Sequence, residues 1–191
     1  MAIRLARLFG LAFARRWRAL ALAAALMALS SAPPALGQDT TLLLPGGATS
    51  LQESFGDWRV ACVIRESEKL CSLSQQHNQQ NGQRVLTIEL IPSGEDVASG
   101  TLILPFGLTL AAGTTLSVDD EPIGDALPFS TCLPAGCLVP LILNRSAIDR
   151  LNSGDALALG ATVNGTAAPL SFTVSLQGFV AAMARTRDLL R

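Results

Sequence analysis

The sequence predicts an all-β fold, a β-sandwich or flattened barrel of short antiparallel strands that carries a short helix, a C-terminal helix and disulfide staples. Three observations predict it. Apolar residues recur with a period of two from residue 58 onward. Turn-forming Gly, Pro and Asn interrupt the apolar runs at short intervals. Four cysteines form two pairs that are close in sequence. Together these features favour a stapled sandwich over a helical or parallel α/β fold.

The clearest element is a hairpin over residues 58–76, which holds Trp58 and two of the four cysteines. Residues 58–65 alternate in the way expected of a strand with one buried face. If Glu66 and Ser67 form a tight turn, large apolar side chains and two sulfurs share that face. The cross-strand pairs expected from this register are Cys62 with Cys71, Val60 with Leu73, and Ile64 with Lys69.

Further short strands follow, separated by polar turns. The expected strand positions are residues 84–91, with Leu86, Ile88 and Leu90 on one face, then 101–104, 108–110, the neighbourhood of Leu116 and Val118, and 138–143. Residues 92–99 are expected to form a polar loop. Pro140 implies an edge position or a bulge, because proline cannot donate to a sheet ladder. Asn164-Gly165 predicts a two-residue type I′ hairpin that pairs Leu159 with Leu170 and Leu157 with Phe172.

Two helices are expected. The first has a capping-box pattern at Ser146 and Asp149 and ends at residues 152–154, with Ile148 and Leu151 on one face. The second begins after Gly178. Its expected apolar face holds Phe179, Met183 and Leu190, and its expected solvated residues are Arg185, Arg187 and Arg191.

Residues 1–37 are typical of a cleaved signal peptide. Five arginines and no acidic residue precede or flank an uncharged run at residues 19–29, which is too short to span a membrane as a helix. Ala35-Leu36-Gly37 fits the small-x-small cleavage rule, and Ser30-Ser31-Ala32 is an earlier alternative. The Arg15-Arg16 pair matches a twin-arginine signal poorly, so ordinary secretion is expected.

Cleavage leaves an acidic chain. Nine of the 14 basic residues remain with all 15 acidic residues, a formal net charge of −6, and no basic cluster favours a nucleic-acid partner. Residues 38–54 predict a flexible N-terminal arm, although Leu42 to Leu44 can instead dock on the domain or add as an edge strand. Residues 55–191 predict one domain.

Four cysteines in an exported chain predict two disulfides, for which three connectivities exist. Local pairing of Cys62 with Cys71 and of Cys132 with Cys137 is favoured, because each pair is close in sequence and bracketed by turn residues. The alternatives are a zinc site or a redox-active dithiol. Neither pair has C-x-x-C spacing, so structural disulfides are the favoured interpretation.

Few residues offer a site for chemistry. His77, the sole histidine, lies among Gln and Asn residues typical of a solvated strand end, so a surface role is favoured over catalysis. Asp119, Asp120 and Glu121 form an acidic run that suits either calcium or paired carboxylates, but without EF-hand spacing a solvated β-turn is favoured. Trp58 is either a sugar-stacking platform or a core anchor, and its register with the buried face favours the core. We assign no catalytic residue, metal site or cofactor.

Several short motifs occur along the chain, and their order is more specific than any one of them. They are Phe55-Gly56-Asp57-Trp58 with Val60 and Cys62, Cys71 with Leu73 and Gln75, Leu104-Pro105-Phe106-Gly107-Leu108, Gly113, Val118-Asp119, Phe129 with Cys132, Gly136-Cys137, and Ser175-Leu176-Gln177-Gly178-Phe179. In this order they resemble the invasion-associated locus B family of bacterial cell-envelope proteins, over about residues 55 to 184. The arm before Phe55 is a departure from the family pattern.

The resemblance implies an exported, periplasmic or envelope-associated protein, at the surface or secreted in some settings, without an established catalytic activity. Pathogenic members are linked to entry into host cells. We therefore expect a non-enzyme that acts through contacts with an envelope or host protein, and no membrane span in the mature chain. Two alternatives are a module that binds a small ligand or glycan through Trp58 or Phe106, and a hydrolase that uses Asp119, Asp120 or Glu121.

Overall fold

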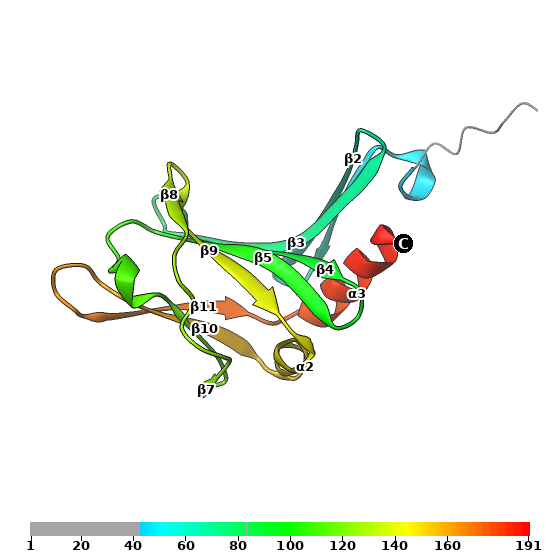
Figure 1. Ribbon diagram of the computed structural model, residues 1–191. Helices are drawn as coiled ribbons and strands as arrows, with labels where there is room; N and C mark the ends of the chain where they lie inside the picture. Colours follow the sequence, from blue (N-terminus) through cyan, green and yellow to red (C-terminus); the bar gives the residue numbers. More distant parts are fainter. Residues whose placement is uncertain (1–42, 83) are drawn as a thin grey trace, which may run out of the picture. The chain divides into compact units, whose positions relative to one another are not determined.

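The computed structural model describes residues 43–82 and 84–191 (Figure 1). The expected signal peptide and residues 38–42 of the expected arm lie outside the described residues. The elements in chain order are η1 (Pro45–Gly47), β1 (Ser50–Phe55), β2 (Trp58–Arg65), β3 (Glu68–Asn78), β4 (Arg84–Ser93), β5 (Val97–Leu104), η2 (Leu110–Ala112), β6 (Thr115–Val118), β7 (Glu121–Pro122), β8 (Thr131–Leu133), β9 (Gly136–Leu143), α2 (Arg145–Ser153), β10 (Ala156–Thr162), β11 (Pro169–Ser175) and α3 (Phe179–Leu190).

The strands form two antiparallel sheets, which confirms the predicted fold class. The large sheet has the order β1-β2-β3-β4-β5-β9-β8, and the small sheet has the order β11-β10-β6-β7. Alternate residues of the large sheet are buried, and these contact α3 and the small sheet in one continuous core. Figure 1 shows α3, β10 and β11 on the same side of the large sheet. The opposite face of the large sheet is therefore the solvent-facing one.

The first hairpin has the predicted register. Cys62 pairs with Cys71, Val60 with Leu73 and Ile64 with Lys69. Glu66 and Ser67 have φ values of 50° and 66°, as a two-residue type I′ turn requires. Burial of the alternate residues of β4 confirms the predicted face of that strand as well.

The domain begins earlier than predicted. Residues 50–54, which we placed in a flexible arm, form most of strand β1, and every residue of β1 pairs with β2. Leu44 is buried against the core, whereas Leu43 is exposed. The alternation of β1 was missed because its solvent-facing residues are Ser, Gln and Ser, which also suit a linker.

Two further boundaries differ from the predictions, and one expected edge position is confirmed. The expected loop at residues 92–99 shrinks to a turn at 94–96 because β4 and β5 extend toward each other. Residues 108–110 do not form a strand, because Leu108 makes one isolated bridge to Val163 and a 3-10 turn starts at Leu110. Pro140 of β9 pairs with β5 on one side. On the other side β8 pairs only with residues 136–138 of β9, so Pro140 lies at a sheet edge, as expected.

The second hairpin has a longer loop than predicted. Asn164-Gly165 lies within a four-residue loop that is closed by a hydrogen bond from Val163 N to Ala168 O, 2.9 Å. Leu159 consequently pairs with Phe172 rather than with Leu170. The shift is by two residues, so the same side chains still face the core.

The helices lie where they were predicted but differ in detail. Asn144, not Ser146, caps α2, because its side chain accepts a hydrogen bond from Ala147 N at 2.9 Å. Phe179 and Met183 of α3 are fully buried, as predicted. The arginines of α3 were expected to be solvated, and this is wrong for Arg185 and Arg187, whose contacts are described below.

Candidate functional site

Trp58 is a core residue and not an exposed platform. Its side chain is 1% exposed. The indole Nε1 donates to Ser175 O at 2.9 Å, and the ring meets Phe179 edge-on at a centroid distance of 5.1 Å. A sugar ring therefore has no access to the indole face, and the alternative that required Trp58 to stack on a ligand fails on burial.

Gln75 is a buried polar residue that sequence reasoning noticed only as part of the family pattern. Its Nε2 donates to Ser175 O at 2.9 Å, and its Oε1 accepts from Ser175 N at 3.1 Å. Because Ser175 ends β11, this pair of hydrogen bonds joins the large sheet to an edge strand of the small sheet. The signal available in the sequence was a polar residue at a core-facing position of β3.

His77 is oriented by a neutral amide. Its Nε2 lies 2.6 Å from Gln75 Oε1, two residues earlier on the same strand. A general base would instead need a carboxylate or backbone partner behind it and a nucleophile in front. The sequence favoured a surface histidine over a catalytic one; in the structure His77 is half-buried and contacts a neutral amide.

The acidic run forms a β-turn, as the favoured interpretation held. Asp119 and Asp120 occupy the turn between β6 and β7 with φ values of 48° and 68°. The Asp119 carboxylate accepts hydrogen bonds from Asp155 N and Ala156 N at 3.1 Å each, so it ties the turn to the start of β10. Glu121 lies 3.8 Å from Arg150 and is exposed. No group of three or more His, Cys, Asp and Glu side chains in residues 43–82 and 84–191 can hold a metal ion.

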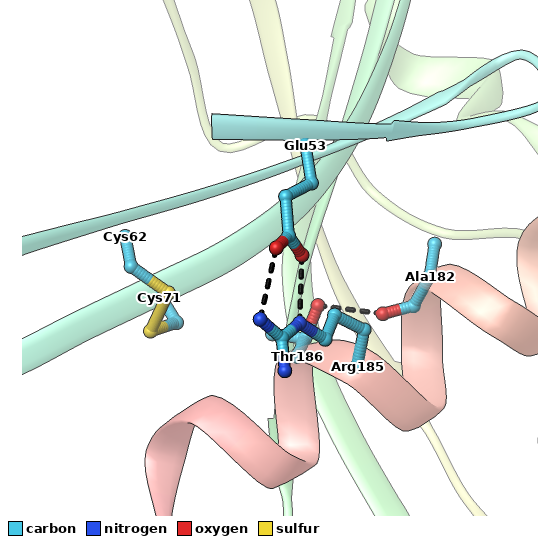
Figure 2. The surroundings of a disulfide bond; sticks show 6 residues. All are labelled: Glu53, Cys62, Cys71, Ala182, Arg185 and Thr186. Atoms are coloured by element: carbon cyan, nitrogen blue, oxygen red, sulfur yellow. Dashed lines mark hydrogen bonds and ion pairs between the residues drawn. A yellow bond between two sulfur atoms is a disulfide. The ribbon is translucent and has the colours of Figure 1, made fainter. Parts of the chain in front are cut away.

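One ion pair holds α3 on the edge of the large sheet, beside the first disulfide. Figure 2 shows the Arg185 guanidinium facing the Glu53 carboxylate, with contacts of 2.7 and 2.8 Å. Hydrogen bonding from Arg185 lowers the pKa of Glu53, and the same bonds raise the pKa of Arg185. The Cys62–Cys71 disulfide lies on the same side of the sheet. Within α3, the Thr186 hydroxyl donates a hydrogen bond to Ala182 O at 2.7 Å.

The end of α3 also holds the turn between β4 and β5. Arg187 donates to the carbonyls of Gly94 and Glu95 at 3.1 and 3.0 Å. Arg191 donates to the Glu95 carboxylate at 3.1 Å. The C-terminal helix α3 thus acts as a clamp across the four consecutive strands β1 to β4, from which it is distant in the sequence.

The largest exposed side chains include several apolar ones. Phe106 is 60% exposed and Ile142 is 77% exposed, and Leu133 is also exposed at the tip of the second disulfide hairpin. A further opening lies where β3 and β4 separate, with Leu70 and Ile91 exposed on its walls. Leu70 and Ile91 lie together in this opening, and grouped apolar side chains are typical of surfaces that contact other proteins. Among the described residues, no helix is long and apolar enough to cross a membrane.

Both cysteine pairs form the favoured local disulfides, Cys62 with Cys71 and Cys132 with Cys137. Each bridges directly opposed residues of an antiparallel hairpin. Neither sulfur pair is available as a zinc ligand set or a free dithiol in this state.

The comparisons with known proteins agree on one family. The model of the family described as invasion associated locus B (IalB) protein matches residues 58–187. An invasion protein B homolog of Brucella abortus (strain 2308) is 40% identical over 176 residues, which cover 92% of this chain and 98% of the relative. The invasion protein B of Bartonella bacilliformis is 33% identical over 158 residues, covering 82% of this chain and 85% of the relative.

A solved structure shares the fold. The crystal structure of invasion associated protein b from Bartonella henselae superposes with a TM-score of 0.69 at 30% sequence identity. The similarity covers 73% of this chain and 96% of that one.

Proposed function

Because the chain belongs to the invasion-associated locus B family, we propose that it is an exported, non-catalytic protein of the cell envelope that acts through contacts with other proteins. The place of action is the periplasm or the cell surface. A role in host-cell entry, which the names of the relatives suggest, follows only for a surface location.

The observation that carries the proposal is that polar side chains considered for catalysis make structural contacts, whereas several large apolar side chains are exposed. Two of the residues considered for chemistry are engaged in structural contacts: Asp119 accepts hydrogen bonds from two backbone amides, and His77 contacts the Gln75 amide. Several large apolar side chains, such as Phe106 and Ile142, are left exposed. Apolar groups in water favour burial against a partner.

Two features support export. Two disulfides are formed, and such bonds persist in oxidising compartments outside the cytosol. The basic and apolar pattern of residues 1–37 is the second.

The deciding experiment is protease treatment of intact cells that make a C-terminally tagged protein, alongside release by gentle disruption of the outer membrane. Digestion on intact cells would support a host-facing role, and protection until the outer membrane opens would support a periplasmic one. A protein that stays in the cytoplasm with thiols open to alkylation would overturn the proposal.

The non-catalytic part has its own test. If the purified protein hydrolyses any envelope substrate and an Asp119→Asn, Asp120→Asn variant of unchanged stability does not, the chain is an enzyme and this part of the proposal fails.

A further inference from the structure

Strand β3 has an open edge next to β4. Residues 68–72 pair with β2, but the pairing of β3 with β4 starts only at Leu73 and Leu90. In the part of the chain that the structure describes, no strand pairs with the other edge of residues 68–72. Figure 1 shows the β2–β3 hairpin turning away from β4 and β5 at this point.

The backbone groups on the open edge follow from the hairpin turn. A two-residue type I′ turn makes Arg65 and Glu68 a hydrogen-bonded pair, so the residues of β3 alternate from there. Lys69 and Cys71 are then in non-hydrogen-bonded positions toward β2. Their N–H and C=O groups point to the open edge, where no strand receives them.

Proline explains why β4 leaves this edge open. Continuing the register of Leu73 with Leu90 would set Pro92 opposite Cys71. This position must donate an N–H toward β3, and proline has none. Beyond Leu90, β4 therefore separates from β3, although it stays paired with β5 through Ser93.

The separation creates a cleft of about 410 Å³. Its walls are Leu70 and Ser72 of β3, Glu89 and Ile91 of β4, and Leu190 of α3, with the disulfide hairpin beside them. Leu70 is 49% exposed and Ile91 is 46% exposed. The cleft thus offers apolar walls next to unpaired backbone groups.

Charges mark the two ends of the cleft. Arg65 and Lys69 line the end near the hairpin turn, and Glu89 lines the inner end, where β3 and β4 are still paired. None of these three side chains forms a salt bridge within residues 43–82 and 84–191. An occupant that carries the opposite charge at each end would complement both.

We propose that this open edge of β3 binds an extended segment of another polypeptide, which adds to the sheet as a strand antiparallel to β3. The segment is apolar in its middle, basic at its N-terminal end and acidic at its C-terminal end. Backbone hydrogen bonds to Lys69 and Cys71 supply the binding, and Leu70 and Ile91 select the apolar side chains. This inference rests on the proposed contact function and names a surface for it.

The test uses the mature, disulfide-bonded protein labelled with ¹⁵N and a panel of capped seven-residue peptides. The first peptide is Lys-Val-Thr-Val-Thr-Val-Asp. The second exchanges the terminal Lys and Asp, and the third has proline in the middle. We expect the first peptide to slow amide exchange at Lys69 and Cys71, with weaker binding of the second and no protection by the third.

Variants with matched controls distinguish peptide binding in the cleft from nonspecific binding to exposed apolar residues elsewhere on the sheet. Ile91→Lys should weaken binding of the first peptide by about tenfold or more, because it places a charge on the apolar wall. Ile142→Lys changes an equally apolar residue on the same sheet face but outside the cleft, and should leave binding unchanged. Lys69→Pro removes the donor on the open edge and spares the ladder to β2, so it should abolish protection at Cys71.

Three outcomes would overturn the inference. They are no protection of these amides by any peptide at millimolar concentration, equal loss of binding in Ile91→Lys and Ile142→Lys, and a dimer in sedimentation equilibrium that Ile91→Lys dissociates. The last would assign the edge to a second copy of the chain. None of them bears on envelope location, which the protease experiment tests separately.

Discussion

Removing the first disulfide should loosen one half of a hairpin before it unfolds the domain. The change is the double variant Cys62→Ala, Cys71→Ala. These two residues are opposite each other, 4.1 Å apart between Cα atoms, and within residues 43–82 and 84–191 β2 is the one strand that pairs with residues 68–72 of β3. The disulfide thus replaces the pairing that β4 does not supply.

The magnitude follows from the loop that the bond closes. A sequence separation of 9 corresponds to a chain-entropy contribution of about 2.6 kcal/mol at 25 °C. Both sulfurs are buried, so lost packing adds to this figure. We expect the free energy of unfolding to fall by about 2 to 4 kcal/mol, which is roughly 4 to 16 °C in Tm for a domain of this size.

The assay is equilibrium unfolding in urea. Trp58 is the only tryptophan outside residues 1–37, and its full burial makes its fluorescence a direct reporter of the core. Amide exchange then reports on the hairpin, and we expect faster exchange at residues 68–72 than at the rest of β3.

The matched control is Cys132→Ala, Cys137→Ala. Its shorter loop, a separation of 5, predicts a loss of about 2.1 kcal/mol without any change in exchange at residues 68–72. A loss below about 1 kcal/mol for the first variant, or unchanged exchange in its hairpin, would refute the idea that the bond substitutes for sheet pairing.

Three further predictions test the clamp, the core and the acidic turn. Phe179→Ala should destabilise the domain by about 3 to 5 kcal/mol in urea unfolding because it empties a fully buried site beside Trp58, whereas Val180→Ala at an exposed position should cost less than about 0.5 kcal/mol. Asp119→Ala should cost about 1 to 2 kcal/mol by leaving the backbone amides of Asp155 and Ala156 without their acceptor, and an equal cost for the exposed Glu121→Ala would contradict that account. Because the pKa of Glu53 is lowered by folding, its contribution to the free energy of unfolding is complete above the unfolded pKa and is lost as pH falls through the lower folded value. Glu53→Gln should therefore flatten the dependence of Tm on pH in the acidic range. An unchanged pH profile would contradict a stabilising ion pair between Glu53 and Arg185.

Local pattern determined a large part of this fold. The period of two, the turn residues and the cysteine spacing define the hairpin of residues 58–76 to the residue, including its disulfide. They do so because a two-residue turn leaves no freedom in the register. Where the loop is longer, as at Asn164, the same reasoning places the strands correctly but misses the pairing by two residues.

The candidate site was less predictable from the sequence. Trp58 and Asp119 could be assigned by pattern to a core and a turn, and both lie there. The contacts that engage them come from Ser175 and Ala156, more than 30 residues away in the chain. Periodicity describes which face a side chain takes, but carries no information about which distant segment meets it.

The sequence by itself determined the fold class, the disulfide pairs, the buried face of each main strand and the family, since all of these depend on local pattern or on ordered motifs. Only the tertiary structure decided that residues 50–54 belong to the sheet, that Arg185 and Arg187 clamp its edge, and that β3 keeps an open edge. Each of these depends on long-range neighbours. The effect of Pro92 shows why: a missing N–H matters only once the fold has decided which strand stands opposite it.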